Sequence, residues 1–144
     1  MVKKSQAVAA LESLKHFIGE SQHKCLLSLF RGEERQYFFD KIVALTETIQ
    51  KMPTSYQTDG QGDSAVAVLH YFKGGLDYYI TEKDLGSTDD PPDERGKQIQ
   101  AFGVTNTGHG AELGYIDIST LIAHNVEIDL YWKPTALREI KKAS

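Results

Sequence analysis

The stretch AVAVLHYFKGGLDYYITE, residues 65–82, decides how this chain folds. Residues 65–72 are apolar on both alternating faces, which is typical of a central strand that is covered on both sides. Lys73-Gly74-Gly75 supplies a turn, and residues 76–82 return as the partner strand. The stretch therefore predicts an antiparallel hairpin at the centre of a sheet.

Further strands follow this hairpin toward the C-terminus. Residues 98–106 and 111–116 predict two more strands, joined by the turn Thr107-Gly108-His109-Gly110. Residues 126–132 alternate apolar and polar side chains and predict a last strand. Because the connections are short, we expect a mostly antiparallel sheet of about five strands.

Helices are predicted before this sheet region in the sequence and again toward the C-terminus. Residues 5–18 carry apolar side chains at helical spacing, with Gly19 as the C-terminal stop. Residues 25–30 predict a short helix, and residues 33–52 predict the clearest helix, which Pro53 ends.

Two short helices are predicted in the C-terminal half. Ser119 is the expected N-cap of a helix over residues 120–124, because a serine oxygen there can accept a bond from a free amide. Pro134 opens a closing helix over residues 135–142, at a position where its missing N–H costs nothing.

The expected fold class is α+β in a single domain, residues 1–144. A helical part, residues 1–53, precedes a sheet part, residues 65–132, and the helices cover one face of the sheet. The loop 83–97 interrupts the sheet part. It contains two prolines and four acids in residues 89–94 and has no apolar anchor, so we expect it to be mobile.

Charge and cysteine content restrict the location and the partners. With 20 acidic and 16 basic residues the net charge is −4, which opposes nucleic-acid binding through Lys and Arg. Lysines and arginine near residues 3–4 and 138–142 leave a local basic patch open. Cys25 is the only cysteine, and no apolar run is long enough for a signal peptide or a membrane span. We therefore expect a cytoplasmic protein without a membrane partner.

No motif for a cofactor, a metal ion or catalysis is found. Residues 58–65 fit G-x-G-x-x-A, but a helix precedes them and a strand follows, the reverse of a dinucleotide site. Their aspartates lack the spacing of a calcium loop, and the five histidines lack the helical spacing of a zinc site. Cys25 lies in an apolar run, where a buried thiol is inert. We predict no cofactor, no metal and no catalytic residue.

Tyrosines gather in the sheet half, and exposed tyrosine beside acids is typical of a protein-binding face. We expect Tyr79 and Tyr131 to face away from the core; the alternative is that aromatic pairs only stabilise the sheet. The predicted docking face combines three segments, 56–63, 79–84 and 108–112. Its candidate binding residues are Tyr56, Asp59, Gln61, Asp63, Tyr79, Glu82, Asp84, His109 and Glu112.

Several segments stand out as a set: RGEERQYFFDK (31–41), YQTDGQGD (56–63), HYF (70–72), YITEKD (79–84), QAFG (100–103), ELGYI (112–116) and DLYWKP (129–134). Together they resemble a family of small uncharacterised proteins, a domain of unknown function, carried by bacterial plasmids, integrating elements and phages. The resemblance implies a bacterial cytoplasm and an accessory gene, and it assigns no catalytic residue. Since such genes often meet host defence systems, it also implies an inhibitor of a defence nuclease as one form of the function.

These observations lead to one main hypothesis and two alternatives. We expect a non-catalytic mobile-element protein that docks on another protein through the predicted face. The first alternative is a small hydrolase or nuclease that uses carboxylates near Asp59, Glu82 and Glu112, and it predicts these acids within about 6 Å of one another. The second, direct nucleic-acid binding, needs basic residues gathered on one face.

Overall fold

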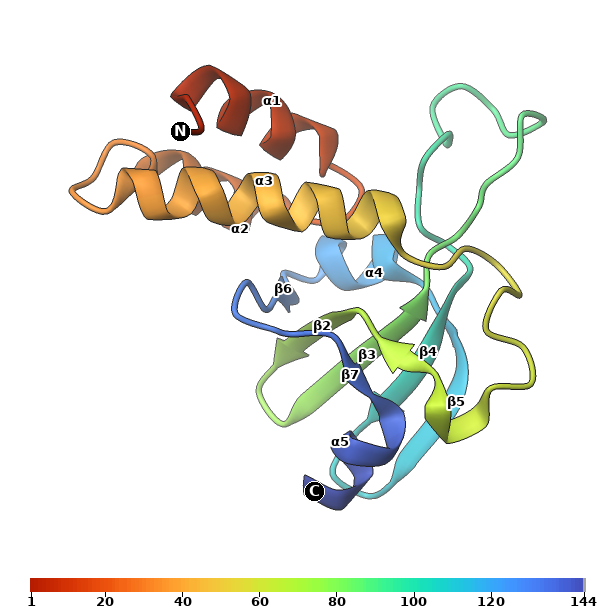
Figure 1. The fold of residues 1–144 in the computed structure, drawn as a ribbon. Coiled ribbons are helices and arrows are strands. Elements are labelled where there is room, and N and C mark those ends of the chain that lie inside the picture. The colour runs from red at the N-terminus through yellow and green to blue at the C-terminus, as the bar shows by residue number, and fades with distance from the viewer. Residues whose placement is uncertain (144) are drawn as a thin grey trace.

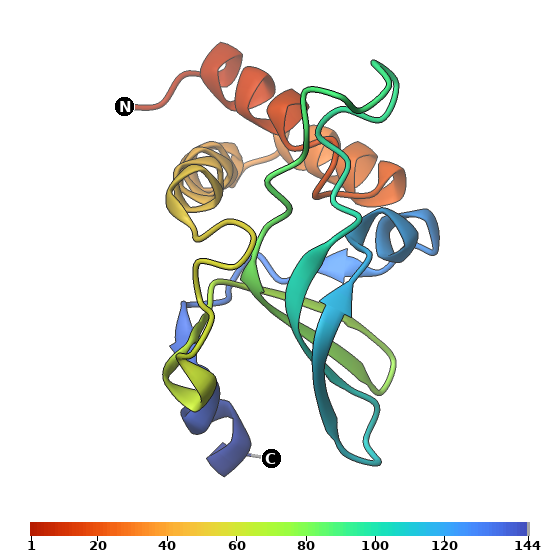
Figure 2. The ribbon, with the colours of Figure 1, turned by 90° about the vertical axis from the view of Figure 1, so that its right-hand side faces the viewer.

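The computed structural model describes residues 1–143, which form three N-terminal helices followed by a five-stranded antiparallel sheet and a small two-stranded sheet (Figures 1 and 2). The predicted α+β class is confirmed. The helices are α1 (Lys4–Ser13), α2 (Glu20–Leu29) and α3 (Arg35–Lys51). Helix α3 buries Phe38, Ile42 and Ile49 at helical spacing and ends before Pro53, as predicted.

The first two helices differ from their predicted bounds. Helix α1 ends at Ser13 and does not reach residue 18, and α2 begins at Glu20, earlier than predicted. Gly19 is not the stop of α1 but the N-cap of α2. A Cβ atom there would lie 2.9 Å from the carbonyl oxygen of Ile122, so the close approach of these two segments requires glycine. Cys25 on α2 is exposed, and the expectation of a buried thiol is therefore wrong.

The larger sheet has the strand order β5-β4-β3-β2-β6, and all its pairs are antiparallel. Its strands are β2 (Leu69–Lys73), β3 (Leu76–Glu82), β4 (Ala101–Asn106), β5 (Ala111–Ile116) and β6 (Glu127–Ile128). The predicted hairpin is β2–β3, with Lys73 opposite Leu76. Gly74 lies in its turn at φ 58°, a left-handed conformation that glycine adopts without a steric cost.

The main core lies between the three N-terminal helices and one face of this sheet. Leu69 and Tyr71 of β2 and Ile80 of β3 are buried there with Ile42 of α3. The hydroxyl of Tyr71 donates a hydrogen bond to the carbonyl oxygen of Phe17, so this buried polar atom is satisfied. Figure 1 shows the N-terminal helices on one side of the sheet, and α4 (Ile118–Ala123) lies on the same side, below α3 in this view.

A second, smaller core covers the opposite face. Strand β1 (Val66–Ala67) pairs with β7 (Thr135–Ala136), and α5 (Leu137–Ala143) follows. Ala65, Ala67, Val104 and Leu137 form this cluster, with Tyr79 packed against it. Tyr79 and its neighbour Ile80 belong to different clusters, which places the clusters on opposite faces of the sheet.

This second core corrects two predicted elements. The predicted strand 65–72 is divided at Val68, because residues 66–67 pair with β7. The predicted closing helix begins at residue 137, not at 135. The amide of Leu137 donates to the carbonyl oxygen of Ala65 at 2.9 Å, which continues the β1–β7 ladder and keeps residues 135–136 extended.

The predicted strand 126–132 is a strand only at Glu127–Ile128. The chain turns after Ile128, because the Asp129 carboxylate accepts a bond from the amide of Tyr131 at 2.9 Å and the amide of Trp132 donates to the Asp129 carbonyl oxygen at 3.3 Å. Local side-chain bonding thus overrides the alternating pattern.

The N-cap of α4 is Asp117 and not the predicted Ser119. The Asp117 carboxylate accepts bonds from the amide of Thr120 at 3.1 Å and from the hydroxyl of Ser119. These bonds hold the pKa of Asp117 below its ordinary value, against the opposing effect of burial, which is the largest single influence.

The segment 83–97 contains no helix or strand, as predicted. Its base is held by Asp84, whose carboxylate accepts bonds from the amides of Gly86 at 2.7 Å and Gln100 at 3.0 Å. Its mobility stays a prediction. Among residues 1–143, no helix combines the length and the hydropathy needed to cross a bilayer.

Candidate protein-docking face

The outer edge of the sheet carries exposed apolar side chains. Strand β5 ends the strand order, so its outer side faces no other strand of the described chain. Leu113 and Tyr115 on β5 are 58% and 61% exposed, and Tyr56 beside them is 61% exposed. Ile116 belongs to the main core, so its neighbour Tyr115 points to the face opposite the N-terminal helices. We call the surface formed by Tyr56, Phe102, Leu113 and Tyr115 the tyrosine face.

Aromatic contacts give the tyrosine face a defined shape. The hydroxyl oxygens of Tyr56 and Tyr115 lie 3.1 Å apart, and one donates a hydrogen bond to the other. The rings of Phe102 and Tyr115 meet edge to face, with centroids 5.6 Å apart. Beside Leu113 lies a hollow of about 130 Å³, whose lining includes Asp59, Gly60, Phe102 and Leu137.

A buried carboxylate positions Tyr56. Glu82, at the end of β3, is only 3% exposed. It accepts hydrogen bonds from the amide of Tyr56 at 2.7 Å, from the amide of Thr58 at 2.9 Å and from the Thr58 hydroxyl. Tyr56 has φ 69°, a left-handed conformation that costs a non-glycine residue about 1–2 kcal/mol. Glu82 thus holds a strained backbone that presents the Tyr56 side chain to solvent.

The tyrosine face lies next to two negatively charged side chains, Asp59 and Glu82. The hydrogen bond with Tyr56 is the main reason why the pKa of the Tyr115 hydroxyl lies above its ordinary value. Loss of hydration and the negative charges of Asp59 and Glu82 raise this pKa further, because they oppose a phenolate. The surface therefore suits a positively charged partner.

The structure brings part of the predicted docking face together. Tyr56 belongs to the tyrosine face, Asp59 lines the hollow beside Leu113, and the buried Glu82 bonds the backbone of Tyr56. Gln61 and Asp63 are exposed before β1, and Asp63 lies in the short 3-10 helix Gly62–Ser64. Asp63 also bonds Lys141 of α5, with 2.6 Å between its carboxylate oxygen and the lysine nitrogen.

The other predicted residues lie elsewhere. Tyr79 faces away from the main core, as expected, but its ring is covered by Trp132, with centroids 5.5 Å apart. Burial, and then the charge of Asp77, raise the pKa of Tyr79. Asp84 organises the base of the loop, His109 is exposed in the β4–β5 turn, and Glu112 lies on β5.

Two acids of the enzyme alternative, Glu82 and Glu112, do not converge. Glu112 is opposite Thr105, and Thr105 is opposite Tyr78 of β3. Glu82 lies four residues beyond Tyr78 on β3, a separation of about 13 Å along the strand. The Glu82 carboxylate is also occupied by the loop that holds Tyr56. In residues 1–143 no three His, Cys, Asp or Glu side chains are grouped to hold a metal ion.

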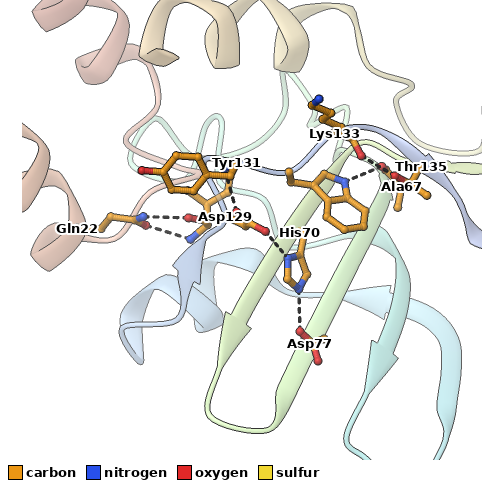
Figure 3. A network of polar contacts seen from close by, with 10 residues as sticks. Gln22, Ala67, His70, Asp77, Asp129, Tyr131, Lys133 and Thr135 are labelled. Atoms are coloured by element: carbon orange, nitrogen blue, oxygen red, sulfur yellow. Dashed lines mark hydrogen bonds and ion pairs between the residues drawn. The ribbon is translucent and has the colours of Figure 1, made fainter. Parts of the chain in front are cut away.

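Sequence reasoning missed a polar network around His70 (Figure 3). Its Nδ1 lies 2.9 Å from an Asp129 oxygen, and its Nε2 lies 2.7 Å from an Asp77 oxygen. The ring also stacks on Tyr79, with centroids 4.9 Å apart. Through Asp129 this network is joined to the turn that follows β6.

Leu113 and Tyr115 were also absent from the predicted site residues. Their signal is the strand ELGYI, in which the side chains opposite the buried position Ile116 are apolar. The pairing of Tyr115 with Tyr56 has no sequence signal, because 59 positions separate them.

Comparison with known proteins gives no relative from which a role could be transferred: no family model, no curated protein and no solved structure matches this chain.

Proposed function

We propose that this protein is a non-catalytic binding module that docks a basic, extended segment of another protein along β5. The observation that carries the proposal is an open edge strand whose outward side chains include Leu113 and Tyr115. An extended peptide can add to such an edge through main-chain hydrogen bonds, while side-chain pockets provide specificity.

The sequence of β5 carries little of the usual protection of an edge strand. Natural edges are commonly blocked by charged side chains, especially lysine, by proline, by bulges or by covering segments. Strand β5, AELGYI, has one charged residue, Glu112, and neither lysine nor proline, and it pairs with β4 in an unbroken register from Ala111 to Ile116. An edge that is six residues long and apolar on one face supports a role in pairing.

The side chains beside β5 fit the proposed partner. Tyrosine and apolar residues around a hollow resemble the centre of a protein interface, where a few anchors provide most of the binding energy. Asp59 and the buried Glu82 charge favour lysine or arginine on the partner strand. The partner is therefore proposed to combine an extended backbone with basic side chains and one apolar anchor for the Leu113 hollow.

The biological setting rests on the sequence resemblance. A mobile-element protein in a bacterial cytoplasm meets host proteins, and we propose a host defence protein as the partner. Many such proteins act on nucleic acid and carry basic surfaces, which matches the charge of the tyrosine face.

Two lysine substitutions test the proposal. Leu113→Lys places on the tyrosine face a positive charge that repels a basic partner, and Leu85→Lys is the matched control, since Leu85 is 70% exposed in the loop. Binding is measured against an array of basic extended peptides and against purified candidate defence proteins. We expect Leu113→Lys to weaken binding at least about thirtyfold, as for a hot-spot residue, and Leu85→Lys to leave it unchanged. Equal affinities of the two variants would show that β5 is not the docking edge.

A further inference from the structure

A positively charged groove lies away from the tyrosine face. It occupies about 780 Å³ between the α1–α2 connection, the first turn of α2, the loop at residue 97 and α4. Its floor includes the apolar side chains of Ile18 and Ile122. We call it the lysine groove, after Lys15, Lys24 and Lys97, which line it.

The charges of the lysine groove are only partly compensated. Lys24 pairs with Glu20, with 3.2 Å between the lysine nitrogen and the carboxylate oxygen. Lys15 and Lys97 make no ion pair within residues 1–143, although Lys97 is half-buried. The groove is thus positive in a chain whose net charge is −4, which concentrates the attraction for anions at one place.

His16 reports the electrostatic potential of the groove. Its pKa is lowered, first by burial and then by the positive charges of Lys15 and Lys97. Both lysines disfavour a positive charge on His16, so both contribute to the positive potential in the groove beside it. An anion bound between them would relieve this repulsion.

The walls of the groove are set by close packing. A Cβ atom at Gly96, which has φ 87°, would lie 2.8 Å from the His16 ring, so glycine lets the loop contact the α1–α2 connection. Gly19 makes the corresponding contact with Ile122 of α4. Lys15 and Lys97 are therefore presented from segments that pack closely against each other at Gly96.

We propose that the lysine groove binds a small phosphorylated molecule, with its phosphate between Lys15 and Lys97 and its apolar part on Ile18 and Ile122. Phosphate is favoured over a single carboxylate because its higher charge and several oxygens can engage two lysines at once. The first turn of α2, which no side chain caps, can add backbone amides to the same anion. A cavity of this volume is of the size that holds small-molecule ligands.

The test uses the full chain and three probes: pyrophosphate, adenosine monophosphate and adenosine. Amide chemical shifts are followed by NMR during each titration. We expect both phosphorylated probes to shift the amides of Glu20, Ser21 and Lys97 with dissociation constants of about 1 mM or lower, and adenosine to have no effect. Each affinity should fall as salt is raised, because ionic attraction between exposed groups is screened.

Charge-removing variants distinguish this site from general attraction. The double variant Lys15→Gln with Lys97→Gln should weaken adenosine monophosphate binding about tenfold or more, whereas Lys51→Gln with Lys133→Gln should not change it. Equal weakening in both double variants, equal binding of adenosine, or no shift with any probe would overturn the proposal. A single-stranded oligonucleotide that binds far more tightly at the same amides would also overturn it, in favour of a nucleic-acid surface.

Discussion

Replacing Glu82 by glutamine tests whether this buried carboxylate organises the tyrosine face. Glu82 is 3% exposed, and its two carboxylate oxygens accept bonds from donors of the loop, Tyr56 and Thr58. Glutamine keeps one acceptor oxygen but directs an NH₂ group at the remaining donors. At least one buried N–H then loses its acceptor.

The magnitude follows from the bonds that are lost. A hydrogen bond to a charged group contributes about 1.5–3 kcal/mol, and an unsatisfied buried donor costs about 1–3 kcal/mol. The smaller desolvation cost of a neutral amide offsets part of this loss. We expect Glu82→Gln to lower the free energy of unfolding by about 2–4 kcal/mol. With a urea m value of about 2 kcal/mol/M, the midpoint should fall by about 1–2 M.

Urea denaturation followed by circular dichroism measures this change, with Glu112→Gln as the matched control. Glu112 is exposed on β5, so its substitution should change the free energy of unfolding by less than about 0.5 kcal/mol. Thr58→Val removes the hydroxyl donor to Glu82, and the two changes should combine less than additively because they break one network. A midpoint shift for Glu82→Gln as small as that of the control would refute the assigned role of Glu82.

Two further predictions concern packing and ionisation. A Cβ atom at Gly103 would lie 1.9 Å from the carbonyl oxygen of Tyr79, whereas a Cβ atom at Gly114, its partner on β5, would have no surrounding atom within 4 Å. Calorimetry should therefore show that Gly103→Ala lowers the free energy of unfolding by about 3 kcal/mol or more. A loss equal to that of the control Gly114→Ala would contradict the close contact between β3 and β4. Tyr56→Phe removes the main cause of the raised Tyr115 pKa, so spectrophotometric titration should show one tyrosine ionising at lower pH than before, a shift that Tyr131→Phe should not produce.

Local sequence signals were sufficient for the hairpin and for α3. Gly74-Gly75 between apolar stretches and the apolar stripe of α3 each depend on neighbours within a few residues. Strand β3 and helix α3 form where predicted, and the other arm of the hairpin is β2, the C-terminal part of the predicted strand 65–72. The same logic failed at Val126–Trp132. There the alternating pattern is real, but the Asp129 side chain bonds the backbone ahead of it and reverses the chain. Ser119 likewise lost the capping position to Asp117, an equally good acceptor two residues earlier.

The candidate site divides in the same way. Tyr56 and Asp59 were found from composition, because tyrosine and aspartate in a glycine-rich turn are usually exposed. The buried position of Glu82 was not predicted from the sequence. Its burial depends on the contact between the end of β3 and the loop at Tyr56 and Thr58, which is 24–26 residues away in sequence.

The amino-acid sequence by itself therefore determined the fold class, the central hairpin and the acidic, tyrosine-rich character of the chain, since these depend on local pattern and composition. Folding decided which side chains meet, Tyr56 with Tyr115 and His70 with Asp77 and Asp129, and it placed Lys15 and Lys97 in the lining of one groove. Such contacts are set by strand order and by the packing of helices on the sheet, which join positions far apart in the chain and leave no local signal.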